Sequence, residues 1–272
     1  MDSYLQFFED MPSWQKLAWI FACLGISWLL EGGVPLFQLR YRKWKHAGVN
    51  MVFLGTTIAI NLLFGILTLG VFEWIGQNQF GLLHLAELPV WVELLIALMI
   101  LDLVAQYFVH YLLHKVKWMW KFHMIHHSDT KVDATTGTRH HPGDYVLREV
   151  FSLAAVFIAG APLAFYLFYR IVTVLFTYLT HANIRVPLWL DKPLSYVFIT
   201  PNMHKFHHHF ERPWTDTNFG NIFSFWDRLF GTMVYDDPGK IRYGLDVLDD
   251  KLDEDIAYQM KIPFDNTIKT DY

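Results

Sequence analysis

The chain has 272 residues, of which 53% are hydrophobic and only 18% are charged, and its formal net charge is −4. An ordinary soluble domain carries about a quarter charged residues, so this composition favours a membrane protein. The negative net charge, with no long basic tract, argues against nucleic-acid binding. The single cysteine, Cys23, excludes an internal disulfide, a cysteine-ligated iron–sulfur cluster and a thiolate zinc site. The acidic N-terminus lacks the positive region of a signal peptide, so we expect no cleaved leader.

Three apolar segments in the first half of the chain are each long enough for a membrane helix, which needs about 20 apolar residues. We expect these helices at residues 17–37, 51–74 and 90–109. The short loop after the first segment contains four basic residues, Arg40, Arg42, Lys43 and Lys45. Short loops rich in Lys and Arg stay in the cytoplasm. By alternation, the third segment should also end on the cytoplasmic side.

A fourth apolar stretch, residues 150–180, contains Gly160 and Pro162. Because Gly suits turns and Pro disfavours helix interiors, we expect a helical hairpin that returns His181 to the cytoplasmic side. Its arms need not both cross the whole bilayer. Residues 110–149 and 181–272 are more polar and are predicted to form a cytoplasmic cap and tail. The predicted fold is one all-α membrane domain over residues 1–272, with about four transmembrane or half-spanning helices and a histidine-rich di-metal cap.

Most of the 14 histidines fall in patterned blocks: an H-x-x-x-H from His110 and an H-x-x-H-H beginning at His123 and again at His204. Residues three or four apart share one face of a helix, and imidazole is the commonest side-chain metal ligand. A lone histidine is more often structural, but three blocks predicted on one side of the membrane favour metal binding. The candidate ligands are His110, His114, His123, His126, His127, His141, His181, His204, His207 and His208. Ten ligands are too many for one ion, so two ions are predicted. Nitrogen ligands alone leave iron and zinc both possible.

These blocks, in this order around a membrane hairpin, resemble the fatty acid hydroxylase/sterol desaturase superfamily of integral-membrane di-iron oxygenases. The resemblance covers roughly residues 90–233. It extends to an R-x-H-P element within residues 138–142, an H-x-N element at 181–183 and a closing segment at 218–232. Asp144 stands where a Glu commonly follows the R-x-H-P element.

The resemblance implies that the histidines hold two iron ions, which activate O2 to hydroxylate or desaturate a lipid, fatty acyl or sterol-like substrate from the bilayer. Carboxylates should orient the imidazoles, and the candidates are Asp102, Asp129, Asp144, Glu149, Asp216 and Asp227. Asn183 is a candidate catalytic residue that would hydrogen-bond a metal-bound water or oxygen species, with a helix or turn cap as the alternative.

Electrons must come from outside, because the sequence shows no haem domain, no dinucleotide-binding glycine motif and no iron–sulfur cysteines. We expect a ferredoxin or cytochrome b5-like donor with its reductase. Basic residues such as Lys115, Lys117 and Lys121 could dock an acidic donor, although contact with lipid headgroups is the simpler interpretation.

Two alternatives come from other functional classes. A membrane zinc-dependent hydrolase would use metal-bound hydroxide to cleave a lipid ester or amide. A bis-histidine haem protein would only transfer electrons, and it leaves too many histidines unexplained. The sequence therefore favours an integral, multi-pass oxidoreductase with its active site on the cytoplasmic side.

Overall fold

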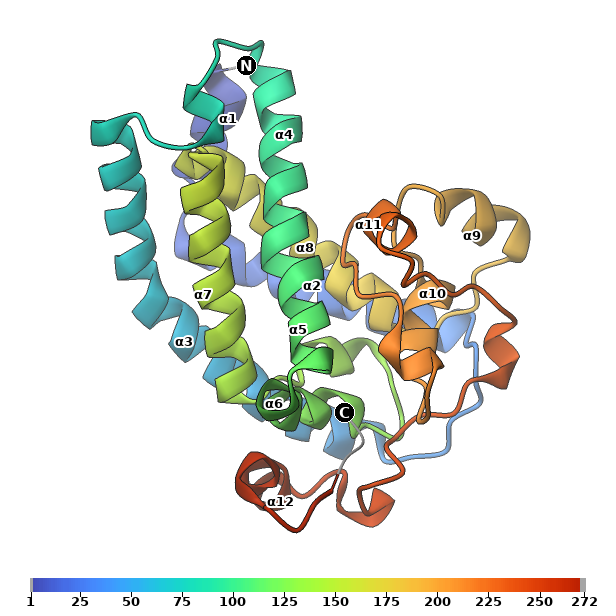
Figure 1. Cartoon of the computed structure of the whole chain (residues 1–272). Coiled ribbons are helices and arrows are strands. Elements are labelled where there is room, and N and C mark those ends of the chain that lie inside the picture. The colour runs from blue at the N-terminus through green and yellow to red at the C-terminus, as the bar shows by residue number, and fades with distance from the viewer. Residues whose placement is uncertain (1, 270–272) are drawn as a thin grey trace.

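The computed structural model describes residues 2–269, and nearly every element in it is a helix (Figure 1). The α-helices are α1 (Asp2–Glu9), α2 (Ser13–Gly33), α3 (Lys43–Asn78), α4 (Val90–Asp102), α5 (Val109–Lys115), α6 (Lys117–His127), α7 (Pro142–Ala159), α8 (Leu163–His181), α9 (Leu188–Leu194), α10 (Pro201–His207), α11 (Phe225–Leu229) and α12 (Ile256–Lys261). Among the described residues, β structure is limited to two isolated bridges, Pro35–Ile184 and Phe198–Phe223. The predicted all-α class is confirmed.

Four segments are long and apolar enough to cross a membrane, as the composition predicted. They are Ser13–Gly33, Lys43–His84, Val90–Lys115 and Leu163–His181. The outer face of α3 is apolar and exposed: the side chains of Leu62 and Ile66 are 73% and 77% exposed. A soluble protein rarely leaves a large contiguous apolar surface open to water, so this face suits contact with lipid tails.

Several helix ends differ from the predicted bounds. Helix α3 begins at Lys43, inside the expected basic loop, because lysine is a good helix former and nothing there interrupts the helix. Helix α7 begins at Pro142, before the expected start of the fourth apolar stretch at residue 150, so it takes in the end of the predicted cap segment 110–149. Proline suits the first helical position because its missing N–H is not needed there, and the side chain of His141 accepts a hydrogen bond from the backbone N–H of Gly143.

The break expected inside residues 150–180 is present between α7 and α8. Gly160 ends α7 with a φ of 65°, a left-handed conformation that glycine adopts without a Cβ penalty. A Cβ placed there would also lie 2.3 Å from the carbonyl oxygen of Phe80. Pro162 then caps α8, which runs back towards the end of the molecule that carries α6 and α10 (Figure 1). Only α8, and not α7, is among the four membrane-length segments.

The main apolar core lies where α3, α4, α7 and α8 meet. Its fully buried members include Leu101, Val156 and Tyr169. A π-helical turn, Leu103–Phe108, joins α4 to α5 and shifts the register of the helix just before His110. Such turns are frequent at functional sites, and this one immediately precedes the first histidine pair.

A buried carboxylate connects α2 to the histidine-bearing end of α8. Glu31 accepts hydrogen bonds from the backbone N–H groups of Ala134 at 2.6 Å and Asn183 at 2.9 Å. It also forms an ion pair with Lys43 at 3.2 Å. Three segments far apart in sequence are thereby fixed beside His181.

Candidate metal centre

The structure brings nine of the ten predicted ligands together in two adjacent clusters. The five-histidine group consists of His110, His114, His123, His127 and His207. The four-histidine group consists of His126, His181, His204 and His208. Within each group, one nitrogen from every ring lies within 4.8 Å of the others, and all nine residues are buried.

Each H-x-x-H-H block contributes to both groups. In α6, His123 and His127 share a face and join the five-histidine group, whereas His126 joins the four-histidine group. In the second block the division is the opposite: His204 and His208 join the four-histidine group, and His207 joins the five-histidine group. Residues four apart lie on one face of a helix, and each successive residue is turned by about 100°. The spacing of the blocks therefore serves two neighbouring sites.

Hydrogen bonds fix which nitrogen of several rings carries the proton. Nδ1 of His110 lies 2.8 Å from the carbonyl oxygen of Phe219, and Nδ1 of His123 lies 2.9 Å from Oδ2 of Asp144. A carbonyl or carboxylate oxygen only accepts, so each Nδ1 must donate, and in the neutral ring each Nε2 then carries a lone pair. These two Nε2 atoms are 3.1 Å apart. Two lone pairs at this distance repel unless a cation lies between them.

The four-histidine group has the same feature. Nδ1 of His181 donates to the carbonyl oxygen of Thr177 at 2.6 Å. Its Nε2 then faces Nε2 of His126 at 3.1 Å and Nε2 of His204 at 3.0 Å. Two nitrogens that each bind one ion at about 2.1 Å are about 3 Å apart when the bonds meet at a right angle. The observed spacings fit a shared metal ion.

Other ring nitrogens in the two groups need a partner. Both nitrogens of His127 and of His208, and Nε2 of His207, are buried without a hydrogen-bond partner within the part of the chain that the structure describes. A buried polar atom without a partner destabilises a protein by about 1–3 kcal/mol. A bound metal in each group would satisfy these lone pairs, so the residues present fit two transition-metal ions.

The protonation states agree with metal binding. Burial lowers the pKa of His123 to about 4, even though Asp144 opposes this effect. Burial also lowers the pKa values of His127 and His208 well below their usual range. These imidazoles are therefore neutral near pH 7, and neutral imidazole is the form that binds a metal.

Of the six candidate carboxylates, Asp144 and Asp216 contact histidines of the two groups. Burial alone would raise the pKa of Asp144, but Arg148 and His123 hold it well below its usual range. Its Oδ2 accepts hydrogen bonds from Nδ1 of both His123 and His140. Asp216 lies 3.6 Å from Nδ1 of His114. Carboxylates in this position orient ligand rings and increase their basicity.

The remaining four carboxylates have other partners. Asp102 and Asp227 accept hydrogen bonds from backbone N–H groups in residues 219–223, and Asp227 binds Phe219, whose carbonyl holds His110. Asp129 pairs with the buried His46, and Glu149 pairs with Arg170. The loop contacts of Asp227 thus support the metal centre indirectly, through the backbone.

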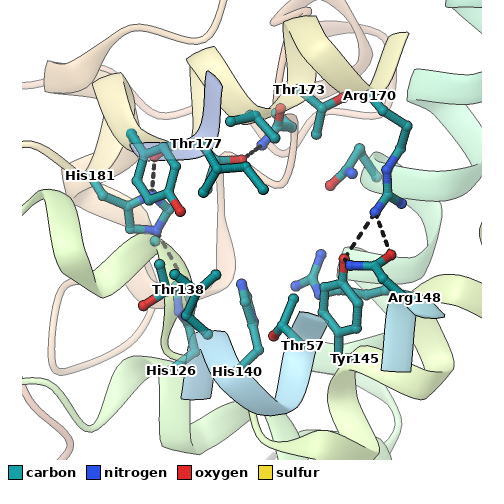
Figure 2. Close-up of a pocket in the computed structure, with 18 of the residues that line it drawn as sticks. Thr57, His126, Thr138, His140, Tyr145, Arg148, Arg170, Thr173, Thr177 and His181 are labelled. Carbon is teal, nitrogen blue, oxygen red and sulfur yellow. Dashed lines mark hydrogen bonds between the residues drawn. The ribbon is translucent and has the colours of Figure 1, made fainter. Parts of the chain in front are cut away.

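A cavity opens beside the four-histidine group (Figure 2). His126, His140 and His181 lie on one side of it, and Tyr145, Arg148 and Arg170 lie on the other. The walls come from the membrane-length segments α2, α3 and α8, as well as from α7 and the loop after His127. The histidine groups therefore face a space enclosed by helices long enough to lie in a membrane.

Comparison with known proteins identifies the family. Residues 94–232, just over half of the chain, match the model of the fatty acid hydroxylase family. The chain belongs to this family. The matched range contains all nine histidines of the two groups. No solved structure matches the chain.

Several curated relatives of this chain carry the names of enzymes that modify lipids. It is 32% identical over 126 residues to ornithine lipid hydroxylase OlsE from Rhizobium tropici, covering 46% of this chain and 37% of that protein. It is 29% identical over 140 residues to alkylglycerol monooxygenase from Homo sapiens, covering 51% of this chain and 30% of that protein. A cholesterol 25-hydroxylase-like protein from Danio rerio is 24% identical over 220 residues, covering 76% of this chain and 84% of that protein. The matches to the first two span about a third of those proteins' lengths.

The tenth predicted ligand, His141, lies outside both groups. Its ring packs against Phe122 in a tilted arrangement and against Phe264 edge-on, and its Nδ1 caps α7. The preceding residue, His140, is placed at the site instead: it lines the cavity and stacks on His126 with ring centroids 4.6 Å apart. The segment before α7 is not helical, and successive side chains of an extended segment point to opposite sides. The sequence pattern predicts His141 as the ligand, because it does not show which of the two side chains turns towards the site.

Asn183 was predicted to be catalytic, but its amide is engaged elsewhere. Its Oδ1 accepts a hydrogen bond from the backbone N–H of Phe37 at 3.0 Å, and its Nδ2 donates to the carbonyl oxygen of Phe37 at 2.8 Å. Asn183 does not line the cavity. The structure therefore gives Asn183 a role in fixing the segment after α8 to the chain between α2 and α3.

Proposed function

We propose that this protein is an O2-dependent oxidoreductase that hydroxylates or desaturates a C–H bond of a lipid. The observation that carries the proposal is the convergence of nine buried histidines in two adjacent groups beside a cavity among membrane-length helices. Two iron ions bound there would supply the reductive activation of O2 needed to attack an unactivated C–H bond. Membership of the fatty acid hydroxylase family, and the names of the relatives, support this reaction class.

The side chains divide into ligands and groups that orient them. The five-histidine and four-histidine groups would each hold one ion. The carbonyl oxygens of Phe219, Thr217 and Thr177 keep the Nδ1 protons of His110, His207 and His181 in place, which directs Nε2 of each ring inward. Asp144 does the same for His123. This fixed arrangement keeps the ligand set in one geometry during the reaction.

The four-histidine group is the one that faces the substrate in this proposal. Three of its members, His126, His181 and His204, line the cavity. The group also has one histidine fewer than its neighbour, so more of its surroundings remain open to O2 and substrate. A lipid would enter from the bilayer past the apolar residues Ile20, Ile58 and Val174, which line the cavity on α2, α3 and α8.

The proposal places the protein in a membrane with the histidine groups on the cytoplasmic side, on the basis of the basic loop at residues 40–45. Electrons would come from a ferredoxin or cytochrome b5-like protein and its reductase. Of the basic residues near the site, Lys115 pairs with Asp216, and Lys121 donates to the carbonyl oxygen of Asp265. Lys117 is left as a candidate contact for an acidic donor.

Lipid extracts from cells that express the wild type and His123→Ala test the reaction. The wild type should produce a lipid heavier by one oxygen atom, or lighter by two hydrogen atoms, that is missing with the variant. Purified protein provides the second arm: removal of iron should abolish the activity, and zinc should not restore it. Activity that zinc restores would instead identify a membrane hydrolase. Failure to consume O2 with any lipid, when two irons and a reductant are supplied, would overturn the proposal.

A further inference from the structure

The wall of the cavity that faces the four-histidine group carries a polar network centred on Tyr145 (Figure 2). Arg170 donates from Nη1 to Oε1 of Glu149 at 2.7 Å. From Nη2 it donates to Oδ1 of Asn61 at 2.8 Å and to the hydroxyl of Tyr145 at 3.0 Å. The Nδ2 of Asn61 also donates to the Tyr145 hydroxyl, at 2.9 Å. Three helices, α3, α7 and α8, meet in this network.

The hydrogen bonds determine where the Tyr145 hydroxyl hydrogen points. A phenolic hydroxyl can accept hydrogen bonds and has one hydrogen to donate. Asn61 and Arg170 are N–H donors at both contacts, so the oxygen of Tyr145 is the acceptor in each. In the part of the chain that the structure describes, the Tyr145 hydroxyl donates no hydrogen bond, and Tyr145 lines the cavity. The hydrogen is therefore available to a molecule bound there.

We propose that Tyr145 donates this hydrogen to a neutral oxygen atom of the lipid substrate, such as an ether, ester, amide or hydroxyl oxygen. This inference rests on the proposed function and adds a substrate class to it. Both arginines of the wall have carboxylate partners: Arg148 pairs with Asp144 at 2.9 Å and Arg170 with Glu149 at 2.7 Å. With its positive charges already balanced, the wall suits an uncharged polar group better than a free carboxylate.

The position of Tyr145 also limits which carbon can be oxidised. The ring of His140 lies near both Tyr145 and the four-histidine group: the ring centroids of Tyr145 and His140 are 6.3 Å apart, and those of His140 and His126 are 4.6 Å apart. A lipid oxygen held by Tyr145 would therefore keep the carbons within several bonds of that oxygen in reach of the four-histidine group. In this inference the oxidised carbon belongs to that stretch of the lipid.

A matched pair of lipids tests the hydrogen bond without any oxidation. Hexadecyl methyl ether and octadecane have the same length and differ by one oxygen in place of one methylene. Each is titrated separately into the detergent-solubilised full chain, and bound lipid is counted by native mass spectrometry. In Tyr145→Phe, the dissociation constant of the ether divided by that of octadecane should rise roughly three- to tenfold relative to the wild type. This is the loss expected for one hydrogen bond. Partitioning into the detergent cancels in this comparison.

Tyr166→Phe is the matched control. The Tyr166 hydroxyl also contacts Arg170, at 3.5 Å, but Tyr166 is buried in the core and does not line the cavity. Its variant should keep the wild-type ratio. Asn61→Asp is a second variant in which the tyrosine remains: the new carboxylate would accept the Tyr145 hydrogen and withdraw it from the cavity, so the ether preference should fall as in Tyr145→Phe.

An unchanged ratio in Tyr145→Phe, or an equal loss in Tyr166→Phe, would overturn the inference. Because binding is measured without iron or reductant, failure of the proposed oxidation leaves this test unaffected. Conversely, an active oxygenase whose lipid preference ignores Tyr145 would refute the inference alone.

Discussion

His207 and His208 are consecutive in the chain, yet their rings stand at 89° to each other and belong to different histidine groups. The next residue, His209, belongs to neither group. Its Nδ1 accepts a hydrogen bond from the backbone N–H of Arg242 at 3.1 Å, and its ring packs on Trp214. Of these three adjacent histidines, His207 lies in the five-histidine group, His208 in the four-histidine group and His209 in neither. Variants of the three should therefore differ in metal content.

His208→Ala should lower the bound metal from two ions per chain to about one, because it removes one ligand from a group that has only four. His209→Ala should keep both ions. Metal content after purification, measured by plasma mass spectrometry, checks both variants. Equal metal loss in the two variants would mean that the groups defined by the structure are not the binding sites.

Asp144→Asn should weaken metal binding by roughly tenfold or more, the range expected when the carboxylate behind a ligand histidine is lost. The amide removes the charge that holds His123 and leaves Arg148 without its partner. Competition with a chelator of known affinity measures the change. Glu149→Gln is the control: it changes a neighbouring carboxylate of α7 whose partner is Arg170, and it should leave metal affinity unchanged.

Lys205→Met should release metal from the four-histidine group in particular. The Lys205 ammonium is fully buried and donates to the carbonyl oxygens of Thr180, Ala182 and Pro201. These bonds join the end of α8, which carries His181, to the start of α10, which carries His204. Metal content should fall by about one ion, whereas the surface variant Lys240→Met should retain both. Full metal content in Lys205→Met would show that the Lys205 hydrogen bonds between α8 and α10 are not needed for metal binding.

Gly160→Ala should destabilise the protein and reduce its metal content. A non-glycine residue in the left-handed region costs about 1–2 kcal/mol, and the added Cβ would also collide with Phe80. Because Gly160 sets the break that returns α8, strain there should also disturb His181. Thermal unfolding in detergent measures the effect. Gly65→Ala, inside α3 with open space around it, should be neutral or stabilising.

Local spacing was sufficient to predict most of the candidate site. All eight histidines of the i, i+3 and i, i+4 blocks lie in the two groups, because helical spacing determines which side chains share a face. His181, which the expected hairpin returns to the same side, is the ninth. The apolar runs likewise predicted the membrane-length helices, and the Gly160–Pro162 sequence predicted the break between α7 and α8.

The remaining features depend on contacts between distant residues. The side chain of Asn183 is hydrogen-bonded to the backbone of Phe37, 146 positions away, and no local sequence pattern predicts this contact. Tyr145 acquires its orientation from Asn61, 84 positions earlier in the chain. The choice between His140 and His141 depends on the direction in which the chain enters α7, which the sequence pattern did not determine.

The proposed function requires that the histidine groups bind metal ions and that the loaded protein inserts oxygen from O2 into a lipid, or removes hydrogen from it. The most direct test supplies iron-loaded protein with a reductant, a lipid extract and ¹⁸O2 in ordinary water, and then measures lipid masses. Hydroxylation predicts one ¹⁸O atom per product, and desaturation predicts loss of two hydrogens only when O2 is present. A product whose new oxygen comes from water, or one that forms equally well without O2, would contradict the account.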